Sequence, residues 1–440
     1  MTNLFGHSVR SEFLLLSLAE ALACFGAFYL ILQIGVPGDS TQGQGVLLVV
    51  AGLLALCTSF ASGATGLYQQ KNWLSAGRLL AGSLLGGLLL VVAAHLVVPQ
   101  VLPGFGGAWL SRLELVAAFV AAVIFTRIAF LTAVQTGALR RRIALPPGPG
   151  TESLRAALQA DALYDVVDLP AHPAPGGLAA WIAGHRPGAV VLDDPAQLPE
   201  ADRRVLEGAG VRLWRAADFA ESRLGQVDLE RLPADWLQDR AGRRDILQAV
   251  VRRAVDISLS CLLLLVTLPV ILVTALAVKL DSPGPVFYRQ QRVGLNGRVF
   301  TLFKFRSMTA DAEKGQAVWA SKNDPRVTRV GKFIRLTRID EIPQVFNVLR
   351  GDMAFVGPRP ERPEFVARLT AIIPHYAARA VVPPGITGWA QVNYPYGASD
   401  EDSRMKLTYD LYYVRRRSLF LDLLILIATV RVVLFQEGSR

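Results

Sequence analysis

Long apolar runs and short polar loops alternate over the first 140 residues. Four apolar segments of about 20 residues each, long enough for helices that cross the roughly 30 Å core of a bilayer, cover residues 13–33, 45–67, 79–98 and 113–134. Positive side chains gather on one side of them, as at Lys71 and at Arg140, Arg141 and Arg142. The positive-inside rule therefore predicts a four-helix transmembrane domain, residues 1–139, with both ends in the cytoplasm.

Two ionisable residues lie inside these predicted spans. Glu20 and Arg127 are each about eight residues from a cytoplasmic end, so their depths agree at about 1.5 Å per residue. They either form a buried pair or face separate partners. Because little else in the spans is polar, the pattern favours an anchor over a transport pathway.

Short apolar runs alternate with helical patterns in the next 80 residues. Strands are predicted at 142–145, 164–169, 189–192 and 211–214, and helices at 151–160, 177–185 and 199–208. This order predicts a small Rossmann-like α/β module, residues 140–222, with a parallel sheet. Prolines 146, 147 and 149 remove the N–H donors that a nucleotide-binding turn needs. We therefore expect a regulatory module or a homodimer surface, followed by a linker over residues 223–242.

A fifth apolar run covers residues 257–278 and has arginines or lysines on both flanks. A spanning helix would have to export one of these basic clusters. Pro269 lies near its middle, where a proline removes a helical hydrogen bond and kinks or breaks the helix. We expect a re-entrant membrane helix, about residues 254–280, that turns near Pro269 and returns to the same face. An ordinary fifth span is the alternative.

Composition and charge support a membrane protein with a basic domain. The chain is 52% hydrophobic with mean hydropathy +0.36, which is too apolar for an ordinary soluble domain. Its net charge of +10 comes from the last 200 residues, which hold 29 Lys and Arg against 17 Asp and Glu. Such a domain suits lipid headgroups or phosphorylated substrates. Nucleic acid is not expected as a partner, because the sequence has no zinc-finger, RNP or basic-zipper pattern.

The most reactive pattern is an adjacent pair of carboxylates, Asp340 and Glu341, in a strongly basic region. Two adjacent carboxylates without charged neighbours would usually lie on a solvated face of a helix, but here cations surround them. The candidates for phosphate binding are Lys304, Arg306, Arg338 and Arg359. Their fields should keep both carboxylates ionised at neutral pH, which suits a nucleophile and a metal ligand. Pro343 should disturb the helix that carries the pair.

An ordered set of motifs in residues 283–429 resembles a known family. The motifs include Phe303-Lys-Phe-Arg-Ser-Met, Asp340-Glu-Ile-Pro-Gln, Asn347-Val-Leu-Arg-Gly-Asp-Met, Val356-Gly-Pro-Arg-Pro and Gly385-Ile-Thr-Gly-Trp-Ala-Gln-Val-Asn. They are similar to the catalytic domain of the bacterial polyprenyl-phosphate hexose-1-phosphate transferases, the monotopic phosphoglycosyl transferases that start exopolysaccharide or O-antigen assembly. The four upstream spans and the α/β module resemble its large members.

The resemblance implies an α/β monotopic catalytic domain, residues 243–440, with a re-entrant helix and interfacial helices on the cytoplasmic face of the bacterial inner membrane. It also implies transfer of hexose 1-phosphate from a UDP-sugar to undecaprenyl phosphate, with release of UMP. In this ping-pong reaction Asp340 is the nucleophile, and Asp340 and Glu341 hold Mg²⁺. Leu268 precedes Pro269 where smaller relatives have a serine.

Two other functions and one other topology are alternatives to this interpretation. A non-catalytic scaffold or regulator of polysaccharide assembly would not require the carboxylate pair, and a transporter would require more polar spans. The last apolar run, after residues 415–417, should lie along the membrane interface with its basic start against anionic headgroups. A short terminal span is the alternative there.

Overall fold

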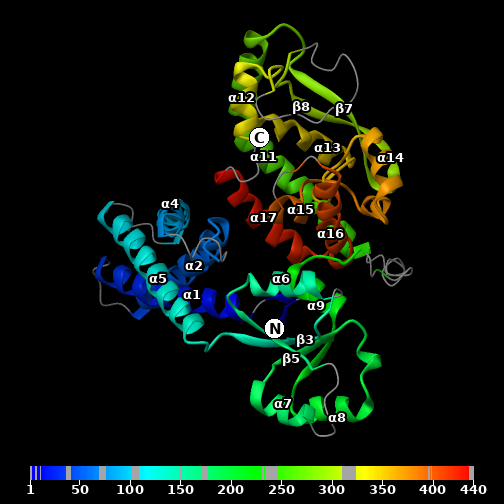
Figure 1. Ribbon diagram of the computed structural model, residues 1–440. Coiled ribbons are helices and arrows are strands. Elements are labelled where there is room, and N and C mark those ends of the chain that lie inside the picture. Colours follow the sequence, from blue (N-terminus) through cyan, green and yellow to red (C-terminus); the bar gives the residue numbers. More distant parts are fainter. Residues whose placement is uncertain are drawn as a thin grey trace. The chain divides into compact units, whose positions relative to one another are not determined.

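The computed structural model of the chain divides into two compact units, Met1–Leu224 and Gly225–Arg440 (Figure 1). It describes residues 2–4, 7–9, 11–35, 41–68, 76–101, 109–148, 151–170, 177–229, 232, 246–309, 324–394, 397 and 399–435. Lys71 and most of the expected linker lie outside the described residues.

Unit 1 opens with a short hairpin, β1 (Thr2–Leu4) and β2 (His7–Val9), and continues with four long helices. These are α1 (Ser11–Gly35), α2 (Thr41–Ala64), α4 (Ala76–Val101) and α5 (Trp109–Gln135). The helices α1 and α4 each contact both α2 and α5. Their shared core includes Phe28, Leu54, Leu90 and Phe119, whereas outward side chains such as Leu56 and Phe125 are exposed.

Glu20 and Arg127 form an ion pair inside this helical part. The Arg127 guanidinium lies 2.9 Å from Glu20 Oε2, and both residues are fully buried. The Ser62 hydroxyl donates to Glu20 Oε1, and Arg127 Nε donates to the Leu67 carbonyl at 3.2 Å. Of the two arrangements that the sequence left open, the structure therefore shows the pair.

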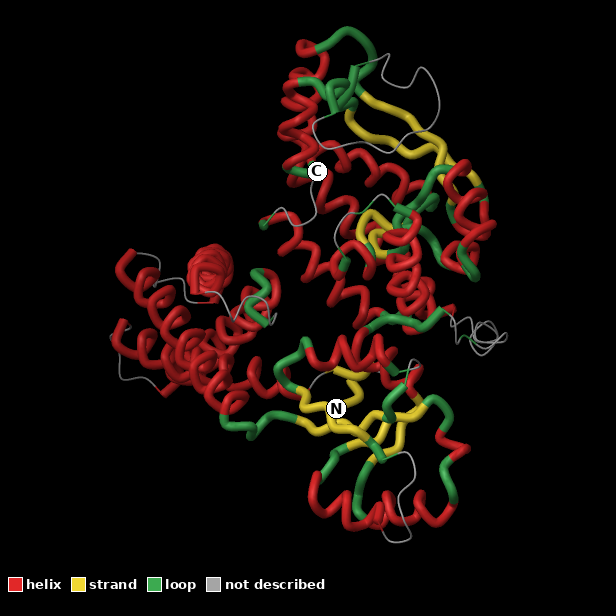
Figure 2. Tube along the Cα trace, in the orientation of Figure 1, coloured by secondary structure: helices red, strands yellow, loops and turns green. Residues whose placement is uncertain are grey.

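The second part of unit 1 is a four-stranded parallel sheet in the order β4-β3-β5-β6. Its strands are β3 (Arg141–Leu145), β4 (Tyr164–Asp168), β5 (Ala189–Leu192) and β6 (Arg212–Arg215). The helices α6 (Glu152–Gln159) and α9 (Ala216–Leu224) supply residues to one core cluster. The helices α7 (Gly177–His185) and α8 (Glu200–Gly208) supply the other. Figure 2 shows these helices on the two faces of the sheet, so the predicted parallel α/β module is confirmed.

The start of the expected linker belongs to unit 2. Val227 N donates to the Thr408 carbonyl at 3.1 Å, and Trp389 Nε1 donates to the Gly225 carbonyl at 2.8 Å. Val227 and Leu229 are buried in the main core of unit 2. The predicted linker over residues 223–242 therefore begins with residues that pack on unit 2, because their apolar side chains gain more by burial than by remaining in water.

The longest helix, α11 (Ile246–Asp281), runs uninterrupted through Pro269. The sequence predicts a kink or a break there; the structure excludes the break, whereas a kink or change of direction within the helix stays a prediction. Thr267 Oγ1 donates to the Leu263 carbonyl at 2.6 Å, and such back-bonding is often associated with helix bending.

The remainder of unit 2 is an antiparallel hairpin surrounded by short helices. The hairpin is β7 (Phe287–Val293) and β8 (Val299–Phe305), and a parallel pair is β9 (Ala354–Val356) and β10 (Gly385–Thr387). The helices, with the short 3₁₀ turn η2 (Leu295–Gly297), are α12 (Arg329–Leu336), η3 (Ile339–Gln344), α13 (Val345–Arg350), α14 (Pro363–Ile372), η4 (Tyr376–Val381), α15 (Trp389–Asn393), α16 (Asp400–Arg416) and α17 (Leu419–Leu434).

Five of the described helices are long and apolar enough to cross a membrane: α1, α2, α4, α5 and α11. The protein is therefore a membrane protein with several apolar helices. The C-terminal helix α17 has 16 residues and is not among the five. Its Leu421 and Ile425 are buried in the core of unit 2, which disfavours the terminal-span alternative. Its placement at the interface stays a prediction.

Candidate active site

The two carboxylates lie on η3, a tight helix whose conformation follows from its ends. Arg338 precedes η3 in the left-handed region at φ 60°, which ends α12 and turns the chain into the new helix. Pro343 lies inside η3 and cannot donate a backbone hydrogen bond. On this helix Asp340 is only 8% exposed. The two carboxylates therefore do not lie on a solvated helix face, as isolated carboxylates usually do.

Glu341 is held by two cations from different elements. Lys304 Nζ, on β8, lies 2.7 Å from Glu341 Oε1. A guanidinium nitrogen of Arg359, in the loop after β9, lies 2.7 Å from the same oxygen. Within the described residues, the Asp340 carboxylate accepts no hydrogen bond. The Glu341 carboxylate is thus held in place by two cations, whereas the Asp340 carboxylate has no such contact within the described residues.

A buried asparagine attaches the next helix to β8. Asn347 Oδ1 accepts from Phe303 N at 3.1 Å, and its Nδ2 donates to the Thr301 carbonyl at 2.7 Å. These two bonds replace the partner strand that the edge of β8 lacks. Because Lys304 follows Phe303 directly, Asn347 sets the distance between Lys304 and η3.

Arg359 is positioned by close backbone packing at β9 and β10. A Cβ at Gly385 would lie 2.1 Å from Gly357 N, and one at Gly388 would lie 2.2 Å from the Gly357 carbonyl oxygen. The absence of a side chain at these two glycines therefore permits the close backbone contact with Gly357. Gly357 lies two residues before Arg359, so this contact fixes the path of the arginine.

Sequence reasoning missed a second support for Arg359. The Arg379 guanidinium donates to the Arg359 carbonyl at 2.9 Å, to Asp410 at 2.6 Å and to the Tyr376 hydroxyl at 3.0 Å. Asp410 is buried on α16. The sequence signal for this support was Asp410 itself, an aspartate ten residues into a helix. An aspartate is rarely buried without a partner.

The structure uses Arg306 differently from the expectation. Its guanidinium donates to the Pro283 carbonyl at 3.0 Å and to the Ser282 carbonyl at 2.6 Å, and the residue is 5% exposed. Arg306 therefore satisfies carbonyls at the end of α11, a role that fits the negative end of a helix, and it is not brought to the carboxylate pair. Arg338 is brought near, since its charge lowers the pKa of both Asp340 and Glu341.

The environment separates the acidities of the two carboxylates. Burial raises the pKa of Asp340 to about 6, against the opposing charge of Lys304. Burial alone would also raise the pKa of Glu341, but Arg359 and Lys304 hold it well below its usual range. Burial lowers the pKa of Lys304, and Glu341 opposes this. Both carboxylates are thus mostly ionised at pH 7, with Asp340 the more basic and hence the better nucleophile.

The carboxylate pair fits a magnesium ion that also binds a substrate. Among the described residues, no group of three or more His, Cys, Asp or Glu residues could hold a metal by itself. Mg²⁺ is commonly bound through one or two carboxylates together with substrate phosphates and water. Asp340 and the second oxygen of Glu341 match this donor set.

Unit 2 combines an exposed apolar helix with a buried carboxylate pair between cations, which places the chain in the class of membrane proteins with a buried, charged site. The family model described as "Bacterial sugar transferase" matches residues 247–436. A relative from Caulobacter vibrioides, a UDP-glucose:undecaprenyl-phosphate glucose-1-phosphate transferase, is 42% identical over 43% of this chain and 71% of its own. The chain belongs to the bacterial sugar transferase family.

Two longer relatives match more of the chain. A UDP-N-acetylgalactosamine-undecaprenyl-phosphate N-acetylgalactosaminephosphotransferase from Aeromonas hydrophila is 42% identical over 53% of this chain and 54% of its own. A UDP-glucose:undecaprenyl-phosphate glucose-1-phosphate transferase from Xanthomonas campestris pv. campestris is 46% identical over 50% of this chain and 46% of its own. The matches thus span about half the length of these relatives.

Proposed function

We propose that the protein transfers hexose 1-phosphate from a UDP-sugar to undecaprenyl phosphate. The observation that carries this proposal is the division of roles in the site: Asp340 is buried, ionised and accepts no hydrogen bond among the described residues, beside a Glu341 held by Lys304 and Arg359. The names of the relatives support the substrate class. As those relatives differ in their sugar, the identity of the hexose is a matter for the assay.

In the proposed reaction the Asp340 carboxylate attacks the β-phosphorus of the UDP-sugar. The bond from that phosphorus to the bridging oxygen breaks, and UMP leaves with the electron pair. A phosphate oxygen of undecaprenyl phosphate then attacks the same phosphorus and releases Asp340. Two displacements of this kind are each easier than one direct transfer between two anions. The products are UMP and an undecaprenyl diphosphate sugar.

The cations of the site act by binding and orientation. Arginine recognises phosphate oxygens through two parallel hydrogen bonds, and Arg338 and Arg359 are the candidates. Lys304 and Arg359 also keep Glu341 ionised and in place. When bound at Asp340 and Glu341, Mg²⁺ would neutralise charge on the transferring phosphoryl group.

We also propose that α11 enters the cytoplasmic leaflet of the bacterial inner membrane and returns to the same face. Both of its ends bond to unit 2: Arg253 donates to the Val348 carbonyl at 2.5 Å, and Asp281 accepts from Val330 N at 3.0 Å. Between these ends Leu265 and Val273 are exposed. A helix that crossed the bilayer completely would carry its two ends to opposite sides.

Labelling of Arg298→Cys in a cysteine-free background should occur only from the cytoplasm, and periplasmic labelling would overturn this topology.

The function is tested by UMP release from membrane-extracted protein. The assay combines undecaprenyl phosphate with UDP-glucose, UDP-galactose or UDP-N-acetylgalactosamine, with and without Mg²⁺. We expect one UDP-sugar to release UMP. Incubation with that sugar in the absence of undecaprenyl phosphate should leave a phosphosugar on Asp340. A non-catalytic scaffold would give no UMP with any sugar, and its wild-type and Asp340→Ala forms would behave alike.

A further inference from the structure

A cavity of about 770 Å³ opens at one edge of the parallel sheet in unit 1. Arg142, Ala189 and Arg212 line it from the beginnings of β3, β5 and β6. The cavity therefore lies at the amino-terminal edge of the sheet. Nucleotides in open α/β folds normally bind at the opposite, carboxyl-terminal edge, so this is a different site from the one that the prolines of residues 146–149 argue against.

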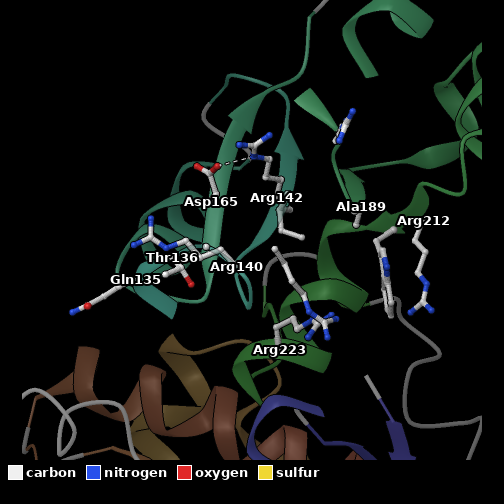
Figure 3. Close-up of a pocket in the computed structure, with 14 residues that line it drawn as sticks. Gln135, Thr136, Arg140, Arg142, Asp165, Ala189, Arg212 and Arg223 are labelled. Carbon is white, nitrogen blue, oxygen red and sulfur yellow. Dashed lines mark hydrogen bonds and ion pairs between the residues drawn. The ribbon is translucent and has the colours of Figure 1, made fainter. Parts of the chain in front are cut away.

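Positive charge dominates the described lining of this cavity. It contains six arginines and one acidic residue, namely Arg140, Arg141, Arg142, Arg186, Arg212, Arg223 and Asp165. Figure 3 shows the Arg142–Asp165 pair together with Arg212 and Arg223 from neighbouring elements. Like charges held together in a concave space repel one another and attract an anion.

Membrane topology does not explain this gathering. The positive-inside rule concerns residues within about 15–20 positions of a span, and it accounts for residues 140–142 after α5. Arg186, Arg212 and Arg223 come from far later in the sequence and reach the same place only through folding. A cluster assembled by tertiary structure from separate elements is a feature of a binding site.

Some of these arginines have protein partners, whereas two have neither an ion pair nor a side-chain hydrogen bond within the described residues. Arg142 Nε lies 3.0 Å from Asp165, and an Arg141 guanidinium nitrogen lies 2.6 Å from Glu12. Within the described part of the chain, Arg186 and Arg212 form no ion pair, and both are exposed. Their guanidinium groups are available to a ligand.

We propose that this cavity binds a ligand that carries phosphate groups, with Arg186 and Arg212 as its main contacts. Guanidinium groups bind phosphate oxygens in a planar, bidentate manner. The cavity has the size of a small-molecule site, about 300–1,000 Å³, and Trp214 adds an aromatic surface. The phosphate could come from a soluble metabolite or, because the end of α5 at Gln135 also lines the cavity, from an anionic phospholipid headgroup.

The test uses the full chain in nanodiscs of phosphatidylcholine, with inorganic pyrophosphate as the probe in calorimetric titrations. The variant is Arg186→Gln with Arg212→Gln, and Arg212→Gln alone is a milder second variant. The matched control is Arg204→Gln, which removes an exposed arginine of the same module that pairs only with Glu200 at the surface. Because all changed side chains are exposed, melting temperatures should stay equal.

We expect the double variant to lose one equivalent of bound pyrophosphate per chain, the single variant to bind it at least tenfold more weakly, and the control to match the wild type. Any binding in unit 2 is common to all proteins, so the difference does not depend on the proposed catalysis. Equal stoichiometry and affinity in all four proteins would overturn the proposal. In discs that also contain phosphatidylglycerol, loss of that equivalent from the wild type identifies the lipid headgroup as the source, and retention identifies a soluble phosphate.

Discussion

Asp340 and Glu341 are neighbours in the chain but differ chemically because different groups surround them. Glu341 has two cations at 2.7 Å, whereas Asp340 has burial without a hydrogen-bond donor among the described residues. A buried carboxylate without a hydrogen-bond donor is more basic than a solvated one, and its ionised form lowers the stability of the fold. Two predictions follow from this contrast.

Asp340→Asn should abolish UMP release, because an amide has no anionic oxygen for attack, and should also raise stability. The folded-state pKa of Asp340 lies above its unfolded value, so at pH 7 the ionised side chain destabilises the fold by roughly 1–3 kcal/mol. The measurement is the melting temperature in detergent beside the UMP assay. Glu364→Gln, an exposed change on α14, is the control and should alter neither. A variant that keeps activity would remove Asp340 from the proposed role.

The dependence of the reaction on pH follows from the same group. Asp340 attacks as the carboxylate, and its pKa is about 6, so kcat/KM should fall about tenfold per pH unit below pH 6 and level off above it. Glu341 remains ionised over this range, because Arg359 and Lys304 hold its pKa lower. The profile is measured as UMP release between pH 5 and pH 8. This is roughly the range in which histidines and carboxylates with a raised pKa titrate. A rate that is constant down to pH 5 would contradict this assignment.

At the scale of elements, the site depends on how η3 and α13 meet the edge of β8. Asn347 is fully buried, and its amide pairs with Thr301 and Phe303 on β8. One side chain thus substitutes for a missing strand. The helix that follows ends at Gly351, which has φ 90°, a conformation that favours glycine.

Asn347→Ala should lower the free energy of unfolding by about 2–4 kcal/mol, since it leaves a buried N–H and a buried carbonyl of β8 without partners. UMP release should fall as well, because Lys304 follows Phe303 on the same strand. Chemical unfolding of unit 2 and the kcat of the surviving protein measure the two effects. Asn393→Ala, an exposed asparagine on α15, is the control. Equal stability of both variants would show that the strand edge does not need the amide.

At the scale of the whole molecule, the catalytic candidates and the helical anchor belong to different compact units. Asp340, Glu341, Lys304 and Arg359 all lie in Gly225–Arg440, whereas the Glu20–Arg127 pair lies in Met1–Leu224. Stability in one unit should therefore be separable from chemistry in the other.

Arg127→Met should destabilise unit 1 by about 3–5 kcal/mol, since it leaves Glu20 as a buried charge without its cation. The double variant Glu20→Gln with Arg127→Met should recover most of this loss, because neither charge then remains. Thermal unfolding in detergent measures both, and UMP release per folded molecule should equal that of the wild type. If the double variant is as unstable as the single one, the ion pair is not the cause of the loss.

Much of the architecture was predictable because it follows from local chemistry. Apolar runs of about 20 residues identify helices for lipid, since the backbone there must satisfy its own hydrogen bonds. The alternation after residue 141 indicated each strand of the parallel sheet to within a residue or two. Asp340 and Glu341 were recognisable from the cations near them in sequence and from the family motifs.

The remaining features depend on which distant residues meet, and that information is not local. In the tertiary structure Arg306 donates to a carbonyl after α11, and Arg379 donates to the carbonyl of Arg359. Tertiary structure also kept α11 helical through Pro269 and gathered six arginines at one edge of the sheet. By itself, the sequence determined the helices, the positions of the strands along the chain and the chemical identity of the carboxylate pair. These features depend on the hydrophobic period and on residue type, which are properties of a few neighbouring positions. Only the tertiary structure decided which cation neutralises which carboxylate, because charge pairing and burial depend on distances between residues that are far apart in the chain.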